Sequence, residues 1–286
     1  MTFYLGLHPD PRVVHAFVWT FEARKAVCMS TGQVNTITSG EPPDVVVEGL
    51  ASWRFLPLKL SPGEYYRRMA RPTSDLLNDS PGVNPENSQI RESIENSRGQ
   101  LVALRDQLER IFRVVHPVPT NFDTYGHDIR NLLILAATEV EAHWKGILKE
   151  NGASGVNTND YVKLLPAMKL DEYSLRLPYY PWLSPVAPFR GWSGSAPTQS
   201  LTWYDAYNAV KHDRESAFNR GTLSDAIQAV CACAILMLAQ FGKSGYHRRD
   251  EISHYFVLDS TPKWEPTEVY VLSGPEVIIR PVAYPF

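Results

Sequence analysis

The sequence predicts a mainly α-helical protein of the α+β class, with an antiparallel helical bundle as its core and β-rich flanks at both ends. Long stretches between residues 88 and 243 repeat apolar residues at steps of three and four, the period of a helix that buries one face. Residues 1–70 and 246–286 instead hold short β-branched and aromatic runs between turn residues. The composition, 44% hydrophobic and 21% charged, suits a chain that buries a sizeable core.

The β-rich N-terminal segment is expected to span residues 1–70. Its most strand-like runs are Val13–Phe21 and Asp44–Glu48, which are rich in β-branched residues. Residues 71–90 hold several proline, asparagine, serine and aspartate residues, so we expect a linker or long loop there. The helical core is then expected to cover residues 91–245.

Three long helices are expected over residues 92–115, 127–149 and 223–241. Pro117 follows the first, and a proline cannot continue a helix. Gly152 follows the second, in the place where glycine commonly ends a helix. Antiparallel packing of the first two helices is the simplest arrangement for this spacing.

Two shorter helices are expected inside the core. One lies within residues 160–168. The other begins near Thr202, a predicted N-cap with Asp205 at the third helical position. Thr222 and Asp225 repeat the same capping pattern at the start of the last long helix.

The segment between these helices, residues 173–199, is rich in aromatic residues and prolines. Prolines exclude a helix or a central strand, so we expect an ordered loop without regular secondary structure that packs on the bundle. Tyr179, Tyr180, Trp182 and Trp192 could stack the bases of a single nucleic-acid strand, although large aromatic residues more often supply core area.

The C-terminal segment, residues 246–286, is expected to return to β structure. Strand-like runs lie near 254–258, 268–272 and 277–282, with a turn at Ser273-Gly274-Pro275. The two β-rich ends of the chain could pair with each other around the helical middle.

Charge and cysteine content narrow the class of protein. A net charge of −3 and a pI near 6.2 argue against a surface that binds nucleic acid everywhere, although a local basic patch can still bind it. Three cysteines without a paired framework indicate a reducing compartment. The longest apolar run, residues 226–241, is shorter than the roughly 20 residues of a spanning helix. We therefore expect a cytoplasmic protein with no membrane or DNA partner and no cofactor.

The most informative stretch is Thr202–Arg214. It carries Asn208 and His212 four residues apart, hence on one helix face, with Lys211 and Arg214 at the same end. A ribonuclease that uses the RNA 2′-hydroxyl as nucleophile needs a base for that proton and a cation at the phosphate. His212 could be the base, and Lys211 or Arg214 could meet the phosphate.

This order, an Asn-x-x-Lys-His turn followed by a long core helix, resembles the active-site region of HEPN-type helical domains. The resemblance covers residues 125–242, less than half of the 286-residue chain. It implies RNA as the partner and a metal-independent ribonuclease, or an inactive relative, of a toxin or defence system. It also implies a homodimer with His212 near a cleft between protomers.

The sequence departs from the family pattern at one position. The family has an arginine, often followed by asparagine, four to six residues before the histidine. Here Tyr207 stands directly before Asn208, and no arginine precedes His212 within the predicted helix. A tyrosine offers no permanent positive charge, so weak or absent cleavage is expected unless another cation holds the phosphate.

A second polar group lies on the second long helix. His127 and Arg130 stand near its start, and Glu139 and His143 lie one turn apart further along. If this helix packs against the motif helix, Arg130 could replace the missing arginine. Glu139 and His143 could instead bind a ligand or a metal with His212, but two ligands on one helix are few for a zinc site. A buried ion pair or a solvated face is the simpler interpretation.

Two classes of function remain open. The first is an RNA-directed protein, which the polar cluster around His212 favours. The second is a non-catalytic helical module that binds a protein partner or a small ligand, which the missing arginine favours.

Overall fold

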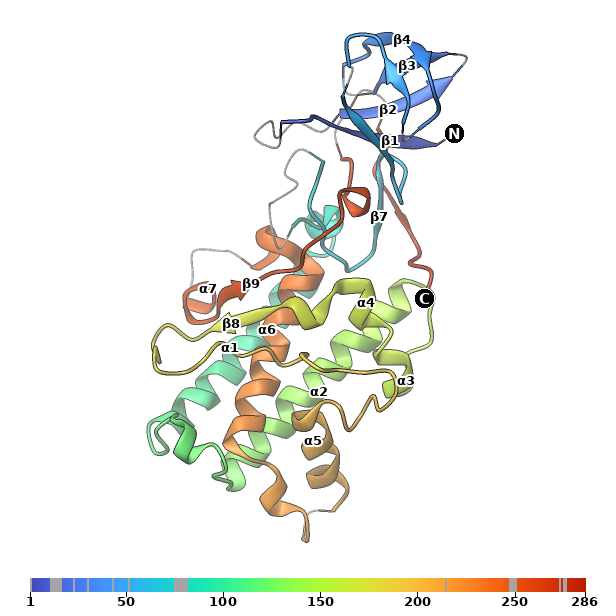
Figure 1. The fold of residues 1–286 in the computed structure, drawn as a ribbon. Helices are drawn as coiled ribbons and strands as arrows, with labels where there is room; N and C mark the ends of the chain where they lie inside the picture. The colour runs from blue at the N-terminus through green and yellow to red at the C-terminus, as the bar shows by residue number, and fades with distance from the viewer. Residues whose placement is uncertain are drawn as a thin grey trace.

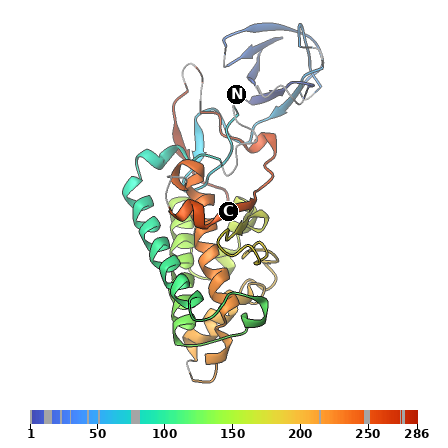
Figure 2. The ribbon, with the colours of Figure 1, turned by 90° about the vertical axis from the view of Figure 1, so that its left-hand side faces the viewer.

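The computed structural model describes residues 2–10, 17–22, 24–29, 31–42, 44–50, 52–74, 82–213, 215–246, 251–272, 274 and 277–286. It is an α+β structure in which a curled N-terminal sheet stands at one end of a group of long helices (Figure 1, Figure 2). The expected fold class is confirmed at this level.

The N-terminal sheet has six antiparallel strands in the order β5-β4-β3-β2-β1-β6. The strands are β1 (Phe3–Leu7), β2 (Phe17–Glu22), β3 (Lys25–Cys28), β4 (Val34–Ser39), β5 (Val46–Val47) and β6 (Arg54–Pro57). Side chains alternate between its two faces, as strand geometry requires. Trp19 and Phe55 are buried in one small core, and Leu5 and Val18 in another.

The two ends of the chain pair, as the sequence suggested. Strand β7 (Glu64–Tyr66) runs parallel to β10 (Arg280–Val282), and Arg280 lies opposite Glu64. The second face of the N-terminal sheet packs on Val269 and Val271 from the C-terminal segment. The C-terminal chain therefore ties the sheet to the helical body.

The helical body is built on α1 (Arg91–Phe112), α2 (His127–Glu150) and α6 (Leu223–Tyr246). Helix α1 runs antiparallel to α2, as expected (Figure 1). Helices α2 and α6 instead run in the same direction, because the bridge between Tyr125 and Thr222 joins their starts. The predicted apolar stripes form one continuous core between them.

Helix α6 lies at the centre of this core. By length and composition it could cross a membrane, but 89% of its most apolar stretch is buried within the protein. Cys231, Cys233 and, in the sheet, Cys28 are free and buried, in agreement with their expected role as small apolar residues.

The last turn of α6 bends at Gly242, whose φ of 65° lies in the left-handed region. The chain at Gly82 crosses the helix here, and Lys243 donates its backbone N–H to Gly82 O at 2.9 Å. A Cβ atom at Gly242 would lie 2.3 Å from Gly82 O, so only glycine fits both the conformation and the crossing.

The segment 71–90, expected as a linker, packs on the rest of the protein where it is described: Thr73 forms a bridge with Tyr270, and residues 82–87 contact α6. Asn84 donates from Nδ2 to the backbone oxygen of Gln240 at 2.7 Å, and a short 3-10 helix η1 (Pro85–Ser88) follows. Residues 75–81 of this segment lie outside the described residues.

Shorter elements lie between the long helices and after the last of them. They are η2 (Pro119–Asn121), α3 (Thr158–Tyr161), α4 (Leu164–Met168), η3 (Leu170–Glu172), α5 (Thr202–His212), η4 (Phe218–Arg220), α7 (Glu251–Tyr255) and η5 (Pro266–Glu268). The single short helix expected within 160–168 is thus divided into α3 and α4.

Three helix boundaries can be compared with their predicted positions and caps. Thr222 and Asp225 exchange the predicted contacts, with Thr222 N donating to Asp225 Oδ2 at 3.1 Å and Asp225 N to Thr222 Oγ1 at 3.3 Å. Thr202 is not a cap, because it is already the first helical residue and Leu201 precedes it. Helix α1 ends at Phe112, three residues before the predicted Val115.

The predicted strands near the C-terminus are partly wrong. The chain is helical to Tyr255 and enters strand β9 (Val257–Ser260) only afterwards, because Tyr255 turns inward to a carboxylate on α1. Strand β9 pairs with β8 (Ser174–Arg176), so the start of the expected irregular loop 173–199 is a strand.

The run 268–272 contributes one bridge, between Tyr270 and Thr73, and not a strand. Its side chains Val269, Tyr270 and Val271 are nevertheless buried, because they join the sheet to the helical body. Of the run 277–282, only Arg280–Val282 forms a strand.

Candidate functional site

The site predicted on α5 lies at the end of the bundle where α2 begins. Tyr204, near the start of α5, donates its hydroxyl to Glu141 Oε1 at 2.7 Å. At the other end of α5, a Cβ atom on Gly221 would lie 3.4 Å from Val210 Cγ1 and 3.7 Å from Arg130 Cα. The two helices are therefore antiparallel, and the end of α5 lies beside the start of α2.

A cluster of one arginine and three rings occupies this end. The Arg130 guanidinium lies 5.2 Å from the ring centre of Phe218, on η4. The rings of His127 and Tyr125 lie 4.9 and 5.8 Å from that of Phe218. Arg130 also donates from Nη2 to Asn131 Oδ1 at 3.0 Å. Arg130 and His127 thus gather around Phe218 at the start of α2, and among the described residues neither side chain contacts Asn208, Lys211 or His212.

The motif side chains on α5 take three different roles. Asn208 donates from Nδ2 to Tyr204 O at 3.0 Å, so its amide is used within the helix. Lys211 donates from Nζ to the Tyr207 hydroxyl at 2.7 Å, a bond that raises the pKa of the lysine. Tyr207 is buried, and it therefore offers a ligand little more than this hydroxyl.

His212 is exposed at the last position of α5. Within the described part of the chain its imidazole makes no hydrogen bond, ion pair or ring contact. Arg214, predicted as a phosphate contact, lies outside the described residues. A base needs a partner that fixes its tautomer and a cation near the phosphate, and the described residues give His212 neither by direct contact.

The second predicted pair, Glu139 and His143, belongs to a different place. Both lie on α2, and His143 is 13 residues beyond Arg130, or about 20 Å along the helix axis. They therefore do not meet His212. Among the described residues, no three His, Cys, Asp or Glu side chains are grouped so as to hold a metal ion.

His143 ends a chain of hydrogen bonds that crosses the core, and Glu139 lies next to it. Arg68 donates from Nε to Gln240 Oε1 at 2.7 Å, and Gln240 donates from Nε2 to His143 Nδ1 at 3.0 Å. Because amide and guanidinium nitrogens only donate, Nδ1 must accept, and the proton lies on Nε2. His143 Nε2 then lies 3.3 Å from Glu139 Oε1.

The electrostatics of this chain follow from its burial. Burial and the charge of Arg68 lower the pKa of His143 to about 3, so the imidazole is neutral at physiological pH. Burial raises the pKa of Glu139, although the charge of Arg68 opposes the shift. Glu139 reaches the surface in an open polar hollow of about 620 Å³ between α1 and α2. His143 is buried, as the ion-pair interpretation required, but its neutral imidazole forms no ion pair with Glu139, and its partners Arg68 and Gln240 were not predicted.

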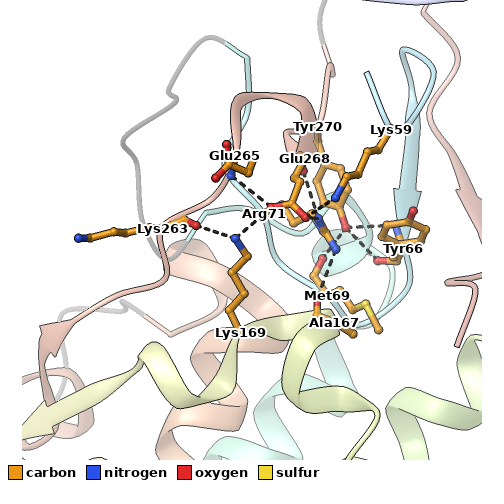
Figure 3. Close-up of polar contacts among 10 residues, drawn as sticks. All are labelled: Lys59, Tyr66, Met69, Arg71, Ala167, Lys169, Lys263, Glu265, Glu268 and Tyr270. Carbon is orange, nitrogen blue, oxygen red and sulfur yellow. Dashed lines mark hydrogen bonds and ion pairs between the residues drawn. The ribbon is translucent and has the colours of Figure 1, made fainter. Parts of the chain in front are cut away.

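A further ionic cluster joins the sheet, the helices and the C-terminal chain (Figure 3). Glu268, on η5, lies 2.8 Å from Lys59 Nζ and 3.1 Å from Lys169 Nζ. Arg71 Nη1 lies 3.8 Å from the same carboxylate and also donates to the backbone oxygen of Glu268. One carboxylate thus meets three cations from three separate segments.

Burial and hydrogen bonding fix the charges of this cluster. Burial alone would raise the pKa of Glu268. The pKa is instead lowered to about 2 by the hydrogen bonds from Lys59 and Lys169 and by the charge of Arg71. The Arg71 guanidinium is buried, 4.5 Å from the ring centre of Trp264. Its Nη2 donates to Ala167 O at 3.2 Å. The Glu268 carboxylate is held by contacts within the chain, so the cluster acts as a structural joint.

The aromatic residues of the segment 173–199 mostly serve packing. Trp192 stacks on Trp144 of α2 with ring centres 4.9 Å apart, and Tyr180 donates its hydroxyl to Glu109 at 2.7 Å. Trp182 donates from Nε1 to Pro117 O at 2.7 Å while 48% of it stays exposed. The predicted ordered loop is confirmed beyond β8, and Trp182 keeps an exposed face.

A small hollow lies under this loop, between it, η2 and the first turns of α6. Its volume is about 260 Å³. Its lining residues are Pro119, Phe122, Trp182, Leu183, Ser184, Pro185, Val186, Ala187, Ser224, Ile227 and Gln228. Nothing in the sequence predicted this hollow.

One sequence signal could have found the missed residues. Gln228 and Gln240 are the two polar residues that interrupt the apolar run of α6. A polar side chain inside an apolar helix needs a partner or a solvated opening. Gln240 meets Arg68 and His143, and Gln228 faces the hollow under the loop.

Comparison with models of known protein families, with curated protein sequences and with solved structures finds no match for this chain. A functional assignment therefore rests on the residues and contacts described above.

Proposed function

We propose that the protein binds single-stranded RNA at the end of the bundle where α5 ends and α2 begins, and cleaves it slowly or not at all. The proposal keeps the resemblance to HEPN-type domains, and with it a cytoplasmic homodimer whose protomers meet near His212. The observation that carries it is the cluster of Arg130, His127, Tyr125 and Phe218 at the start of α2, the end of the bundle where α5 ends at the exposed His212.

The cluster offers the two contacts that an unpaired RNA strand needs. Arg130 is a permanent cation on the neighbouring helix, and we propose that it replaces the missing motif arginine. Tyr125 is 51% exposed. His127, two residues later, is also exposed, and both rings contact the ring of Phe218. Rings of this kind stack nucleobases of any sequence. Affinity should therefore depend on salt through Arg130 and on stacking through Tyr125.

Cleavage, where it occurs, would use His212 as the base for the 2′-hydroxyl proton. Arg130, Lys211 or Arg214 would hold the phosphate. Lys211 is already hydrogen-bonded to Tyr207, and Arg130 to Asn131. Each cation must break or share that bond in order to bind an RNA phosphate. This competition is the physical reason for expecting a slow reaction.

Binding is tested by fluorescence anisotropy with an unstructured RNA oligonucleotide at several salt concentrations. Arg130→Gln and Tyr125→Ala are each expected to weaken binding about tenfold, from the loss of one phosphate or one stacking contact. Arg91→Gln, an exposed arginine at the opposite end of the bundle, is the matched control and should bind like wild type. Equal affinities for all four proteins, or no RNA binding at low salt, would overturn the proposal.

Cleavage is tested with the same RNA in the presence of EDTA. A reaction through the 2′-hydroxyl needs no metal and leaves a 2′,3′-cyclic phosphate. His212→Ala should lower the rate at least about 100-fold, the lower limit for a general base. Equal rates for wild type and His212→Ala would remove His212 from the mechanism. RNA binding without cleavage would identify a non-catalytic RNA-binding protein.

A further inference from the structure

The hollow under the aromatic loop has the size of a nucleobase site. A cavity of about 150 Å³ accommodates benzene, so the 260 Å³ of this hollow has room for a two-ring heterocycle. Most of its wall is apolar, and Phe122, Ile227 and Trp182 supply its large apolar side chains. Such a wall favours a flat, weakly hydrated ring.

Three polar side chains line the hollow, Ser184 from the loop and Ser224 and Gln228 from α6, and the two on α6 have unused hydrogen-bonding capacity. Ser224 and Gln228 lie one turn apart on α6, and both line the hollow. Among the described residues, neither side chain has a hydrogen-bond partner. An amide presents two donors and two acceptor positions, and a hydroxyl presents one donor and two. Together they could read the polar edge of a base.

The wall is held in place before any ligand arrives. Trp182 is fixed by its bond to Pro117 O at 2.7 Å, and its ring lies 5.0 Å from that of His116. Ser224 N donates to Phe122 O at 3.1 Å, and this bond joins the lining residue Phe122 to the start of α6. A rigid platform of this kind lowers the entropy cost of binding.

The hollow adjoins the proposed RNA-binding end. Leu223 N donates to Thr124 O at 2.8 Å, and Tyr125 forms a bridge with Thr222. The chain that carries Phe122 into the hollow is thus the chain that carries Tyr125 into the arginine–aromatic cluster. A strand held at the cluster needs only a short extension to reach the hollow.

We infer that this hollow receives one unstacked nucleobase of the bound RNA, which stacks on Trp182 and bonds to Gln228 and Ser224. The inference rests on the proposed function for its source of the base, but the hollow can be tested alone. Insertion of a base would give the protein a preference at one nucleotide, whereas the arginine–aromatic cluster binds without sequence preference.

The test titrates wild type, Gln228→Leu and Trp182→Ala with the four ribonucleosides by calorimetry, and with RNA by anisotropy. Gln107→Leu, a half-buried glutamine on α1 outside this hollow, is the matched control. Wild type and the control should bind at least one nucleoside. Trp182→Ala should weaken RNA binding about tenfold, the cost of one stacked base. Gln228→Leu should reduce the preference among nucleosides.

The outcomes separate the two proposals. RNA binding that is unchanged by Gln228→Leu and Trp182→Ala, with no nucleoside binding, would overturn the base site and leave the RNA proposal standing. Nucleoside binding that depends on Gln228, without RNA binding, would support the hollow as a base-sized site and contradict the RNA proposal. No binding of either ligand would overturn both. Circular dichroism spectra of the variants that match wild type would exclude unfolding as the cause.

Discussion

His143 Nε2 lies 3.3 Å from Glu139 Oε1, one helical turn away on α2, and this contact ends a hydrogen-bonded chain that begins at Arg68. The chain links the segment after the N-terminal sheet to the two central helices. Each of its bonds has a defined donor, because the guanidinium and the Gln240 amide nitrogen cannot accept. The network is therefore a specific connection within the core, and its loss should be measurable.

Replacing His143 by alanine should destabilise the fold. The imidazole is buried, and its removal takes one hydrogen-bond partner from Gln240 Nε2 and leaves a cavity beside Glu139. We expect a loss of about 3 kcal/mol in the free energy of unfolding, the cost of unmade buried hydrogen bonds plus a cavity. Urea denaturation measures it. His127→Ala, an exposed histidine on the same helix, should change stability by less than about 0.5 kcal/mol.

The same histidine should make stability depend on pH. Its folded pKa of about 3 is below the ordinary value of 6.5, so the unfolded chain binds this proton more readily. The contribution of His143 to the free energy of unfolding is therefore fully present above pH 6.5. It decreases as pH falls below this value, by up to about 1.4 kcal/mol per pH unit. Urea titrations from pH 7.5 to pH 5 should give a steeper slope for wild type than for His143→Gln. Identical slopes would mean that His143 is not buried in the neutral form.

The joint around Glu268 should respond unequally to removal of its members. Glu268→Gln leaves the buried Arg71 guanidinium without its carboxylate, and we expect a loss of about 3 kcal/mol. Lys59→Met removes a cation whose side chain is 59% exposed, and it should cost less than about 1 kcal/mol. Thermal and urea unfolding of both variants provide the comparison. Equal effects would contradict the distinction between a buried and an exposed ion pair.

Two glycines on different helices should respond to alanine with opposite signs. Gly242→Ala places a Cβ atom 2.3 Å from Gly82 O at a positive φ, so a loss of at least about 2 kcal/mol is expected. Gly99 lies inside α1 with open space around its Cα, and Gly99→Ala should stabilise the protein by about 0.5–1 kcal/mol. Stabilisation by Gly242→Ala would show that the chain at Gly82 does not cross the helix there.

The sequence by itself determined the elements whose signals are local. Apolar residues at helical spacing located α1, α2 and α6, because an amphipathic helix must bury that stripe whatever packs against it. The exchange of contacts between Thr222 and Asp225 was equally readable, since both partners lie within one turn. The sequence also placed Arg130 and His212 on two helices that proved to be neighbours.

Only the tertiary structure decided what depends on distant partners. Tyr255 ends a helix where its sequence suggested a strand, because its hydroxyl reaches Glu109 on α1. Glu139 and His143 belong to the core and not to the site at His212, because Arg68 and Gln240, 172 residues apart, meet them there. Burial sets the charge of a titratable group, and burial is the sum of contacts from the whole chain. A local sequence pattern identifies candidate site residues. Their charge and their contacts are determined only by the folded chain.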